Sequence, residues 1–264
     1  MTPSGTNLYA LDVGEIKNSY LPLGKSSMSP KQRSVLIVDD ELSLRNVLRI
    51  SLAASGFAVE EARGGKEALE TVEGHSFDLV LLDINMPGPS SIETCRKIRG
   101  MSPHVGIVVV SVQDFEDDKI RALEAGADDY VTKPFSLREL TARLRAVIRR
   151  IRVEEHEPEV IQDGKLKIDF LRRLFWRGKE EIHLSPTEFD LLAFMMKRPD
   201  TVLEHVTLLR TIWGPEYGGE LEYLRIYVRR LRMKIEDDPS RPEYILTEPW
   251  VGYRFRNPGS LSVR

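Results

Sequence analysis

Five side chains with the right chemistry for handling a phosphate group are spread over the first half of the chain. Asp39, Asp40 and Asp83 supply carboxylate oxygens, Ser111 a hydroxyl and Lys133 an ammonium group. Carboxylate oxygens suit a magnesium ion, which keeps several of its waters. Such an ion would offset the charge of a phosphoryl group arriving on Asp83, and Lys133 would add a second cation. An aspartate nucleophile, a metal, a lysine and a hydroxyl are a set suited to phosphoryl transfer by positioning and electrostatics.

Taken singly, each of these residues has a simpler explanation. A lone aspartate after a strand is usually a turn residue or a helix cap, and a lone lysine is usually a solvated surface group. The carboxyl ends of parallel strands, however, are where α/β sheets build their sites. Neighbouring carboxylates there repel one another unless a divalent cation lies among them. The chain predicts such a site because three polar positions follow apolar runs in order: Asp39 after 35–38, Asp83 after 79–82, and Ser111 after 108–110.

The elements that must position these residues alternate from 34 to 151. Short apolar runs indicate buried strands, and between them apolar residues recur at helical spacing. The last helix is the clearest, with Leu140, Leu144 and Val147 on one stripe. Five strand–helix units predict an α/β domain with a five-stranded, parallel, doubly wound sheet covered on both faces. The strands are expected at 35–38, 57–60, 78–82, 106–110 and 128–131.

A second, α+β domain is predicted over 160–257, after an acidic, proline-containing linker at 152–159. Ser185 and Glu188 form a capping box that predicts the start of its first helix. Two further helices and a terminal β-hairpin follow, which is typical of a winged helix-turn-helix. The helices are expected at 205–213 and 219–236, short antiparallel strands at 165–169, 172–177 and 180–183, and the hairpin strands at 244–247 and 251–255.

The composition fits a globular protein of two domains. The 264 residues are 41% hydrophobic and 30% charged, with a net charge of −3. Cys95 is the one cysteine, so a disulfide framework is excluded, and we interpret Cys95 as a small apolar residue. The lack of a membrane-spanning apolar run and of a secretory signal predicts a cytoplasmic protein without a membrane partner. Residues 1–33 and 258–264 show no core pattern and are expected to be flexible tails.

The helix expected over 219–236 combines a core stripe with two basic faces. Leu224, Val228, Leu231 and Ile235 form the stripe. Such a helix suits a DNA major groove, where most of its cations would touch phosphates. A solvated basic face is the alternative, but the position between a short helix and a hairpin favours DNA. Arg230 is the candidate base contact, and the other candidate DNA contacts are Arg225, Tyr227, Arg229, Arg232, Lys234, Thr247 and Arg254.

The set in the first half closely resembles the receiver domain of bacterial two-component response regulators. The resemblance covers about residues 34–150 and rests on Asp39–Asp40, Asp83, Ser111, Lys133–Pro134 and the string 125–130. It implies that a sensor histidine kinase phosphorylates Asp83. It also implies that the domain accepts and loses phosphate without being a turnover enzyme.

The same resemblance implies roles for individual residues. Mg²⁺ or Mn²⁺ would be bound by Asp40, Asp83 and the backbone carbonyl of Asn85, with Asp39 acting through water. Ser111 and Tyr130 would be the switch pair, in which the hydroxyl moves toward the phosphate and the aromatic ring swings inward. The Lys133–Pro134 peptide bond would be cis.

Residues 160–256 resemble the winged-helix effector domain of the OmpR/PhoB subfamily. Within them the strings 213–218 and 223–232 are similar to the Kdp potassium-transport regulators, which implies promoter DNA as partner and a potassium-transport operon as target. In the subfamily the loop matching 213–220 contacts RNA polymerase. Trp250 departs from the pattern, because a small residue is usual there. Of stacking on DNA and packing on its own hairpin, we favour packing.

The resemblance also implies a homodimer. In the subfamily, charged positions on the last two helices and the last strand of the receiver form a symmetric dimer on activation. Simple solvation is the alternative, since exposed ion pairs contribute only about 0.2–1 kcal/mol each. The matching residues are Lys119, Asp128, Asp129, Glu139, Arg143 and Arg150.

These features predict a transcriptional regulator whose phosphorylation at Asp83 promotes receiver dimerisation and promoter binding. One departure is the 88–91 loop, which carries Ser90–Ser91 where the family has an Asp-Gly pair. Because of this departure, a regulator that binds DNA independently of phosphorylation is kept as an alternative function. The other alternative is a haloacid-dehalogenase-like phosphotransferase, which also uses a strand-end aspartate. Enzymes of that family resemble one another in carrying a second aspartate two residues after the first. Asn85 occupies that position here.

Overall fold

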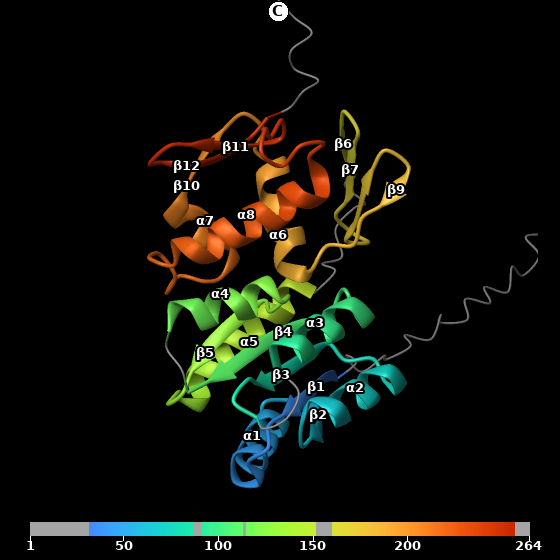
Figure 1. The fold of residues 1–264 in the computed structure, drawn as a ribbon, viewed down its shortest axis with the longest axis vertical. Helices are drawn as coiled ribbons and strands as arrows, with labels where there is room; N and C mark the ends of the chain where they lie inside the picture. Colours follow the sequence, from blue (N-terminus) through green and yellow to red (C-terminus); the bar gives the residue numbers. More distant parts are fainter. Residues whose placement is uncertain (1–31, 87–90, 113–114, 152–159, 257–264) are drawn as a thin grey trace, which may run out of the picture. The chain divides into compact units, whose positions relative to one another are not determined.

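The computed structural model describes residues 32–86, 91–112, 115–151 and 160–256, and its first half is built around a parallel sheet (Figure 1). The strand order is β2-β1-β3-β4-β5, with every neighbouring pair parallel. This arrangement confirms the predicted doubly wound sheet. The strands are β1 (Arg33–Val38), β2 (Phe57–Ala62), β3 (Leu79–Asp83), β4 (Gly106–Ser111) and β5 (Asp129–Thr132).

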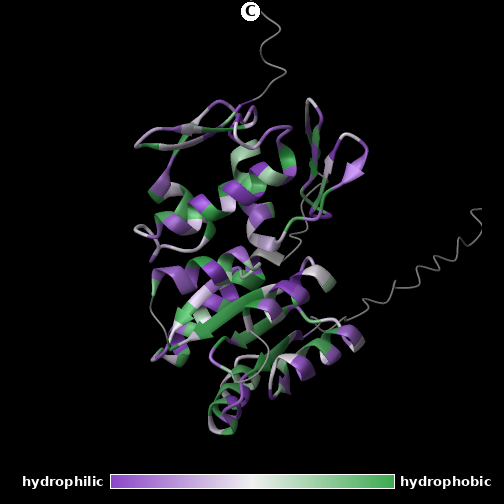
Figure 2. Ribbon diagram, in the orientation of Figure 1, coloured by the Kyte–Doolittle hydropathy of each residue, from purple (hydrophilic) through white to green (hydrophobic). Residues whose placement is uncertain are grey.

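Helices cover both faces of this sheet, which explains why its central strands are apolar along their whole length. Val35 and Ile37 of β1 join one core cluster with side chains of α1 and α5, and Leu36 and Val38 join the other with side chains of α2, α3 and α4. Figure 2 shows the apolar residues gathered along these strands. The helices are α1 (Leu42–Ala54), α2 (Gly65–Gly74), α3 (Ser91–Met101), α4 (Glu116–Glu124) and α5 (Leu137–Ile151).

The second half is a three-helix domain between two antiparallel sheets. The capping box is present, because Ser185 Oγ accepts a bond from Glu188 N and the Glu188 side chain accepts one from Ser185 N. The sheets have the orders β6-β7-β8-β9 and β10-β12-β11. Their strands are β6 (Val160–Asp163), β7 (Leu166–Asp169), β8 (Leu174–Arg177), β9 (Glu180–Glu181), β10 (Val202–Glu204), β11 (Ile245–Glu248) and β12 (Gly252–Phe255), and the helices are α6 (Pro186–Met196), α7 (His205–Ile212) and α8 (Leu221–Ile235).

Two strands of this domain have no counterpart among the sequence predictions. β6 and β10 are only four and three residues long, too short for a recognisable alternation of apolar and polar residues. β10 forms by pairing with β12, about fifty residues later in the chain. At this pairing, a side chain on Gly252 would lie 1.9 Å from the carbonyl oxygen of Leu203. Only glycine allows the two strands to approach so closely.

The described residues between 32 and 256 belong to one structural unit, in which α8 packs against α4 and α6 packs against α5. The winged-helix elements therefore contact the α4–β5–α5 side of the first domain. Among the described residues, no helix has the length and apolar character needed to cross a membrane.

Candidate functional site

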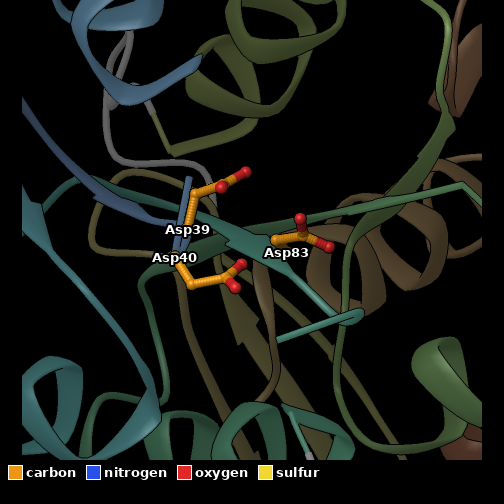
Figure 3. Close-up of side chains that lie close together, drawn as sticks. All are labelled: Asp39, Asp40 and Asp83. Atoms are coloured by element: carbon orange, nitrogen blue, oxygen red, sulfur yellow. The ribbon is translucent and has the colours of Figure 1, made fainter. Parts of the chain in front are cut away.

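Three carboxylates meet at the carboxyl edge of the parallel sheet, as the sequence predicts. One oxygen each from Asp39, Asp40 and Asp83 lies within 4.8 Å of the other two. Figure 3 shows Asp39 and Asp40 together at the end of β1, with Asp83 on the neighbouring strand β3. Asp39 and Asp83 are buried, whereas Asp40 is exposed and gives the cluster access to solvent.

Lys133 joins two of these carboxylates. Its Nζ atom lies 2.6 Å from Asp83 Oδ2 and 3.1 Å from Asp39 Oδ2. Burial lowers the pKa of Lys133, but its bonds and charge interactions with Asp83 and Asp39 outweigh burial, so the pKa is raised overall. The ammonium group is therefore held charged beside the candidate phosphoacceptor. The Lys133–Pro134 peptide bond is cis, as expected.

The electrostatics of Asp39 fit a cation site. Burial raises the pKa of Asp39, and the negative charge of Asp83 raises it further. The backbone N–H of Glu41 and the Lys133 ammonium lower it, but the net shift is upward. One lysine thus leaves the acidic cluster short of positive charge. The donor set is purely oxygen, which fits Mg²⁺ or Mn²⁺ better than a softer metal.

Ser111 and Asn85 connect this cluster to β4. The Ser111 hydroxyl, which is fully buried, donates to Asn85 Oδ1 at 2.9 Å, and the N–H of Val112 donates to the same oxygen at 3.0 Å. The N–H of Asn85 in turn donates to Asp83 Oδ1 at 2.8 Å. A continuous path of hydrogen bonds therefore runs from Asp83 to Ser111. The side chain of Tyr130, the other expected switch residue, is buried.

Part of the predicted dimer surface is occupied by the winged-helix domain. Thr187 Oγ1 donates to Asp128 Oδ1 at 2.8 Å, and the Tyr217 hydroxyl lies 2.7 and 2.9 Å from the two carboxylate oxygens of Asp129. Arg143 lies 3.5 Å from Asp129 Oδ2, with its guanidinium over the ring of Tyr217. Of the remaining predicted residues, Lys119 is half-buried on α4 and Glu139 is exposed on α5, while the side chain of Arg150 lies outside the described part.

The predicted DNA-binding helix, α8, is partly covered in the same way. Its core stripe is buried as expected. Tyr227 is 0% exposed, and its hydroxyl donates to the carbonyl of Ala127 in the receiver. Arg230 Nη1 donates to the carbonyl of Leu123 at 3.1 Å. Two predicted DNA contacts therefore face the receiver in this arrangement.

The other predicted DNA contacts lie on α8 or on the wing formed by β11 and β12. Arg225 and Arg229 are exposed, although Arg229 Nη1 lies 2.7 Å from Glu124 on α4. Arg232 donates to Thr247 Oγ1 at 2.8 Å and so ties α8 to the wing. Lys234 lies 2.6 Å from Glu188, and Arg254 lies 2.6 Å from Glu248.

Trp250 does not pack on its own hairpin, so that expectation is wrong. It is 99% exposed at the turn between β11 and β12. Its backbone φ is +69°, in the left-handed region.

Sequence reasoning missed the second role of Glu188. This fully buried carboxylate caps α6, and it also lies 2.8 Å from Arg230 and 2.6 Å from Lys234. A glutamate is expected at this position of a capping box. The sequence around Glu188 therefore gives no separate indication of an ion pair. Trp213 and Tyr217 were likewise recognised only as part of a family string, and both side chains are buried.

Comparisons with known proteins agree with both halves of the structure. The family model of the response regulator receiver domain matches residues 35–145, and the model described as transcriptional regulatory protein, C terminal, matches residues 178–255. The KDP operon transcriptional regulatory protein KdpE of Escherichia coli K12 is 41% identical over 222 residues, covering 84% of this chain and 98% of that protein. The sensory transduction protein RegX3 of Mycolicibacterium smegmatis is 40% identical over 225 residues, with the same two coverages.

The similarity extends to three-dimensional structure. A solved structure of a RitR mutant has a TM-score of 0.69 and 27% identity, covering 85% of this chain and 99% of that one. The match therefore spans the receiver and the winged helix together. The chain belongs to the two-component response regulators of the OmpR/PhoB type, and it is a transcriptional regulator in which a receiver domain precedes a winged-helix DNA-binding domain.

Proposed function

We propose that this regulator is switched on by phosphorylation of Asp83, and that the phosphorylated chain binds promoter DNA as a homodimer. A sensor histidine kinase is the phosphodonor. The observation that carries the proposal is the 2.6 Å contact between Lys133 Nζ and Asp83 Oδ2. A carboxylate oxygen of Asp83 forms the bond to phosphorus while the bond to the donor's imidazole nitrogen breaks. Lys133 then lies where it neutralises an oxygen of the transferred group.

Asp39, Asp40 and Asp83 would hold Mg²⁺ or Mn²⁺ together with the backbone carbonyl of Asn85. Their close-set oxygens and the raised pKa of Asp39 support this assignment. A bound divalent ion supplies positive charge to the phosphoryl oxygens. The exposed position of Asp40 leaves an entry path for the ion.

Ser111 would carry the phosphorylation signal toward β5. Its hydroxyl donates to Asn85, whose own N–H is bonded to Asp83. We infer that the hydroxyl turns to an oxygen of the phosphoryl group, and that the side chain of Tyr130 on the neighbouring strand adjusts with it. Because Tyr130 directly follows Asp128 and Asp129, this change would act on the residues that contact the winged helix.

The contacts of α8 support a closed, inactive state. Tyr227 is buried against the receiver, and Arg230 is bonded to the carbonyl of Leu123. Neither side chain can reach a base while these contacts persist. We therefore infer that activation separates α8 from α4, after which the receiver face is free for a second copy and α8 for DNA.

The test is phosphorylation with a small phosphodonor and Mg²⁺. Wild-type protein is expected to form an acyl phosphate, and Asp83→Asn is expected to abolish both the acyl phosphate and the gain in promoter affinity. Asp117→Asn, on the exposed first turn of α4, is the matched control and should behave as wild type. If Asp83→Asn leaves DNA affinity and dimerisation unchanged, the regulator binds DNA independently of phosphorylation. Steady phosphate release from unrelated esters would instead indicate a phosphotransferase.

We infer that the protein acts in the cytoplasm, because its proposed target is promoter DNA. The 213–220 loop is our candidate contact for RNA polymerase. The KdpE similarity supports a potassium-transport operon as target, although the RegX3 relative is equally similar. Loss of potassium-dependent expression of such an operon on deletion of this gene would decide the point.

A further inference from the structure

Two histidines, one from each domain, meet where the receiver and the winged helix are in contact. His104 lies between α3 and β4, and His183 lies between β9 and α6. Their ring centroids are 5.9 Å apart, with the ring planes at 80° to each other. Both residues are open to solvent, so a solute can reach them. In the part of the chain that the structure describes, neither ring makes a hydrogen bond.

The fold holds the backbone of both histidines in place. Arg99 Nη1 donates to the carbonyls of the two residues on either side of His104, at 2.7 and 2.6 Å. Lys234 Nζ donates to the carbonyl of His183 at 2.8 Å. The two exposed rings therefore stand on fixed supports, and the distance between them depends on the contact between the domains.

Glu181 adds a carboxylate to the pair. Its Oε1 atom lies 3.9 Å from His183 Nδ1. Two atoms that share a tetrahedral zinc ion are about 3.4 Å apart, because each lies about 2.1 Å from the metal, and two imidazole rings on such an ion have centroids roughly 5 Å apart. The observed separations of 3.9 and 5.9 Å exceed these values by about 1 Å or less. Rotation of exposed side chains can close such a difference.

The surroundings of His104 favour its neutral form, which is the form that binds a metal. Partial desolvation lowers the pKa of the imidazole. The charges of His183, Arg99 and Arg173 lower this pKa further, and the charge of Glu181 raises it, with a net downward shift. A neutral imidazole has the lone pair that a metal ion needs.

The nearby arginines do not prevent a cation from binding, because each has its own carboxylate. Arg99 lies 2.6 Å from Asp128, and Arg173 lies 2.7 Å from Asp190. Imidazole nitrogens together with a carboxylate suit Zn²⁺, Ni²⁺ or Cu²⁺, whereas Mg²⁺ prefers oxygen ligands. The donor set of the histidine pair therefore differs from that of the acidic cluster around Asp83.

We propose that His104, His183 and Glu181 bind a divalent transition-metal ion such as Zn²⁺, which joins the two domains and stabilises the closed state. This inference rests on the closed state proposed above. Opening of the chain leaves His104 on one domain and the other two ligands on the other. The ion therefore binds the closed chain more tightly than the open one, and its binding opposes activation.

Zinc titration of the full chain tests the ligand set. The unphosphorylated protein is titrated with Zn²⁺ by calorimetry in excess Mg²⁺, which competes for the acidic cluster. His104→Gln and His183→Gln should each raise Kd by about tenfold or more. The double variant should bind little more weakly than either single one, because the shared ion is lost only once. Losses that add in the double variant would indicate two independent surface histidines and overturn the proposal. His75→Gln, at an exposed position after α2, is the matched control and should bind Zn²⁺ as wild type does.

Acrylamide quenching of Trp213 tests whether the ion closes the chain. Trp213 is 1% exposed, and its indole N–H donates to the receiver, so separation of the domains should expose it. In a chain with Trp176→Phe and Trp250→Phe it is the one remaining tryptophan. Adding Tyr217→Phe weakens the domain contact, and Zn²⁺ should then lower the quenching constant about threefold. Adding His104→Gln as well should abolish this protection, and equal protection with and without it would contradict the proposal.

The outcomes distinguish this inference from the closed state on which it rests. If wild-type protein and His104→Gln bind Zn²⁺ equally tightly, the metal site is overturned while the closed state stands. If Trp213 is quenched as freely in the folded chain as in urea, with or without Zn²⁺, the domains do not form the closed state and both inferences fail.

Discussion

At the scale of single residues, buried charges are stabilised by partners from distant parts of the sequence. Lys133 lies between Asp39 and Asp83, and Glu188 lies between Arg230 and Lys234. The first group could be predicted, because polar residues directly after apolar runs converge at one sheet edge. The second could not, because the capping role of Glu188 gave no hint of its two cationic partners.

The ionisation of Glu188 should make stability depend on pH. Burial raises the pKa of Glu188, but Arg230, Lys234 and the N–H of Ser185 outweigh burial, and the net pKa is lowered. A lowered pKa means that the folded state favours the carboxylate. The resulting stability is present above the ordinary value of 4.5 and is lost as the pH falls through the lowered pKa.

Replacing Glu188 with Gln should therefore reduce the free energy of unfolding at neutral pH by about 3–5 kcal/mol, since it leaves two cations without their buried partner. It should also flatten the fall in stability at acidic pH. Urea unfolding of the full chain at a series of pH values measures both effects. Glu180→Gln, at an exposed position in β9, is the control and should keep the wild-type profile. An unchanged acidic limb in Glu188→Gln would contradict the assignment.

At the scale of elements, α8 presents three faces with different roles. One face packs in the domain core, and one meets the receiver and α6 through Tyr227 and Arg230. The third face exposes Arg225 and Arg229, of which Arg229 pairs with Glu124 of α4. The sequence predicted the core face, because its apolar residues repeat at helical spacing. It did not predict which basic face would be covered, since that depends on contact with a helix about a hundred residues earlier.

Two arginines on α8 should affect DNA binding differently once the protein is phosphorylated. Arg230→Ala should relax base preference at one position by about 1–3 kcal/mol. Arg229→Ala should weaken binding to all sequences about equally, because we propose that its exposed guanidinium contacts a phosphate once α8 has left Glu124. The measurement uses a duplex that phosphorylated wild-type protein has selected from a random library, and a panel of its single-base variants shows the difference. Arg241→Ala, exposed beyond the end of α8, controls for net charge. Unchanged selectivity in Arg230→Ala would remove it from base recognition.

At the scale of the whole molecule, the receiver and the winged helix are joined by polar contacts that exclude solvent. Tyr217 bonds to Asp129, Thr187 bonds to Asp128, and the indole N–H of Trp213 donates to the Asp128 carbonyl at 3.3 Å. No local pattern could have predicted these bonds. Asp128 and Asp129 match charged positions of the family, but their partners come from a domain that folds around its own core.

Weakening this contact should activate DNA binding without phosphate. Tyr217→Phe removes a hydroxyl whose single proton is shared between the two oxygens of a buried carboxylate, and a hydrogen bond to a charged group contributes roughly 1.5–3 kcal/mol. The unphosphorylated variant should therefore bind the selected duplex at least tenfold more tightly than unphosphorylated wild type. The gain should persist in the Asp83→Asn background, which separates it from any effect on phosphorylation. Equal affinities of the variant and the wild type would contradict an inhibitory role for the contact.

The contact of Tyr217 with Asp129 and Arg143 has a consequence for gene dosage. The winged helix that covers Asp129 is tethered to it, so its local concentration is fixed by the chain itself. In the proposed dimer, a second copy that competes for the same residues arrives by diffusion, and its concentration follows the number of molecules per cell. The fraction of regulator in the open dimer should then rise with expression level even at a constant kinase signal. If the regulator also activated its own gene, the fraction of open dimer would rise more steeply with the kinase signal.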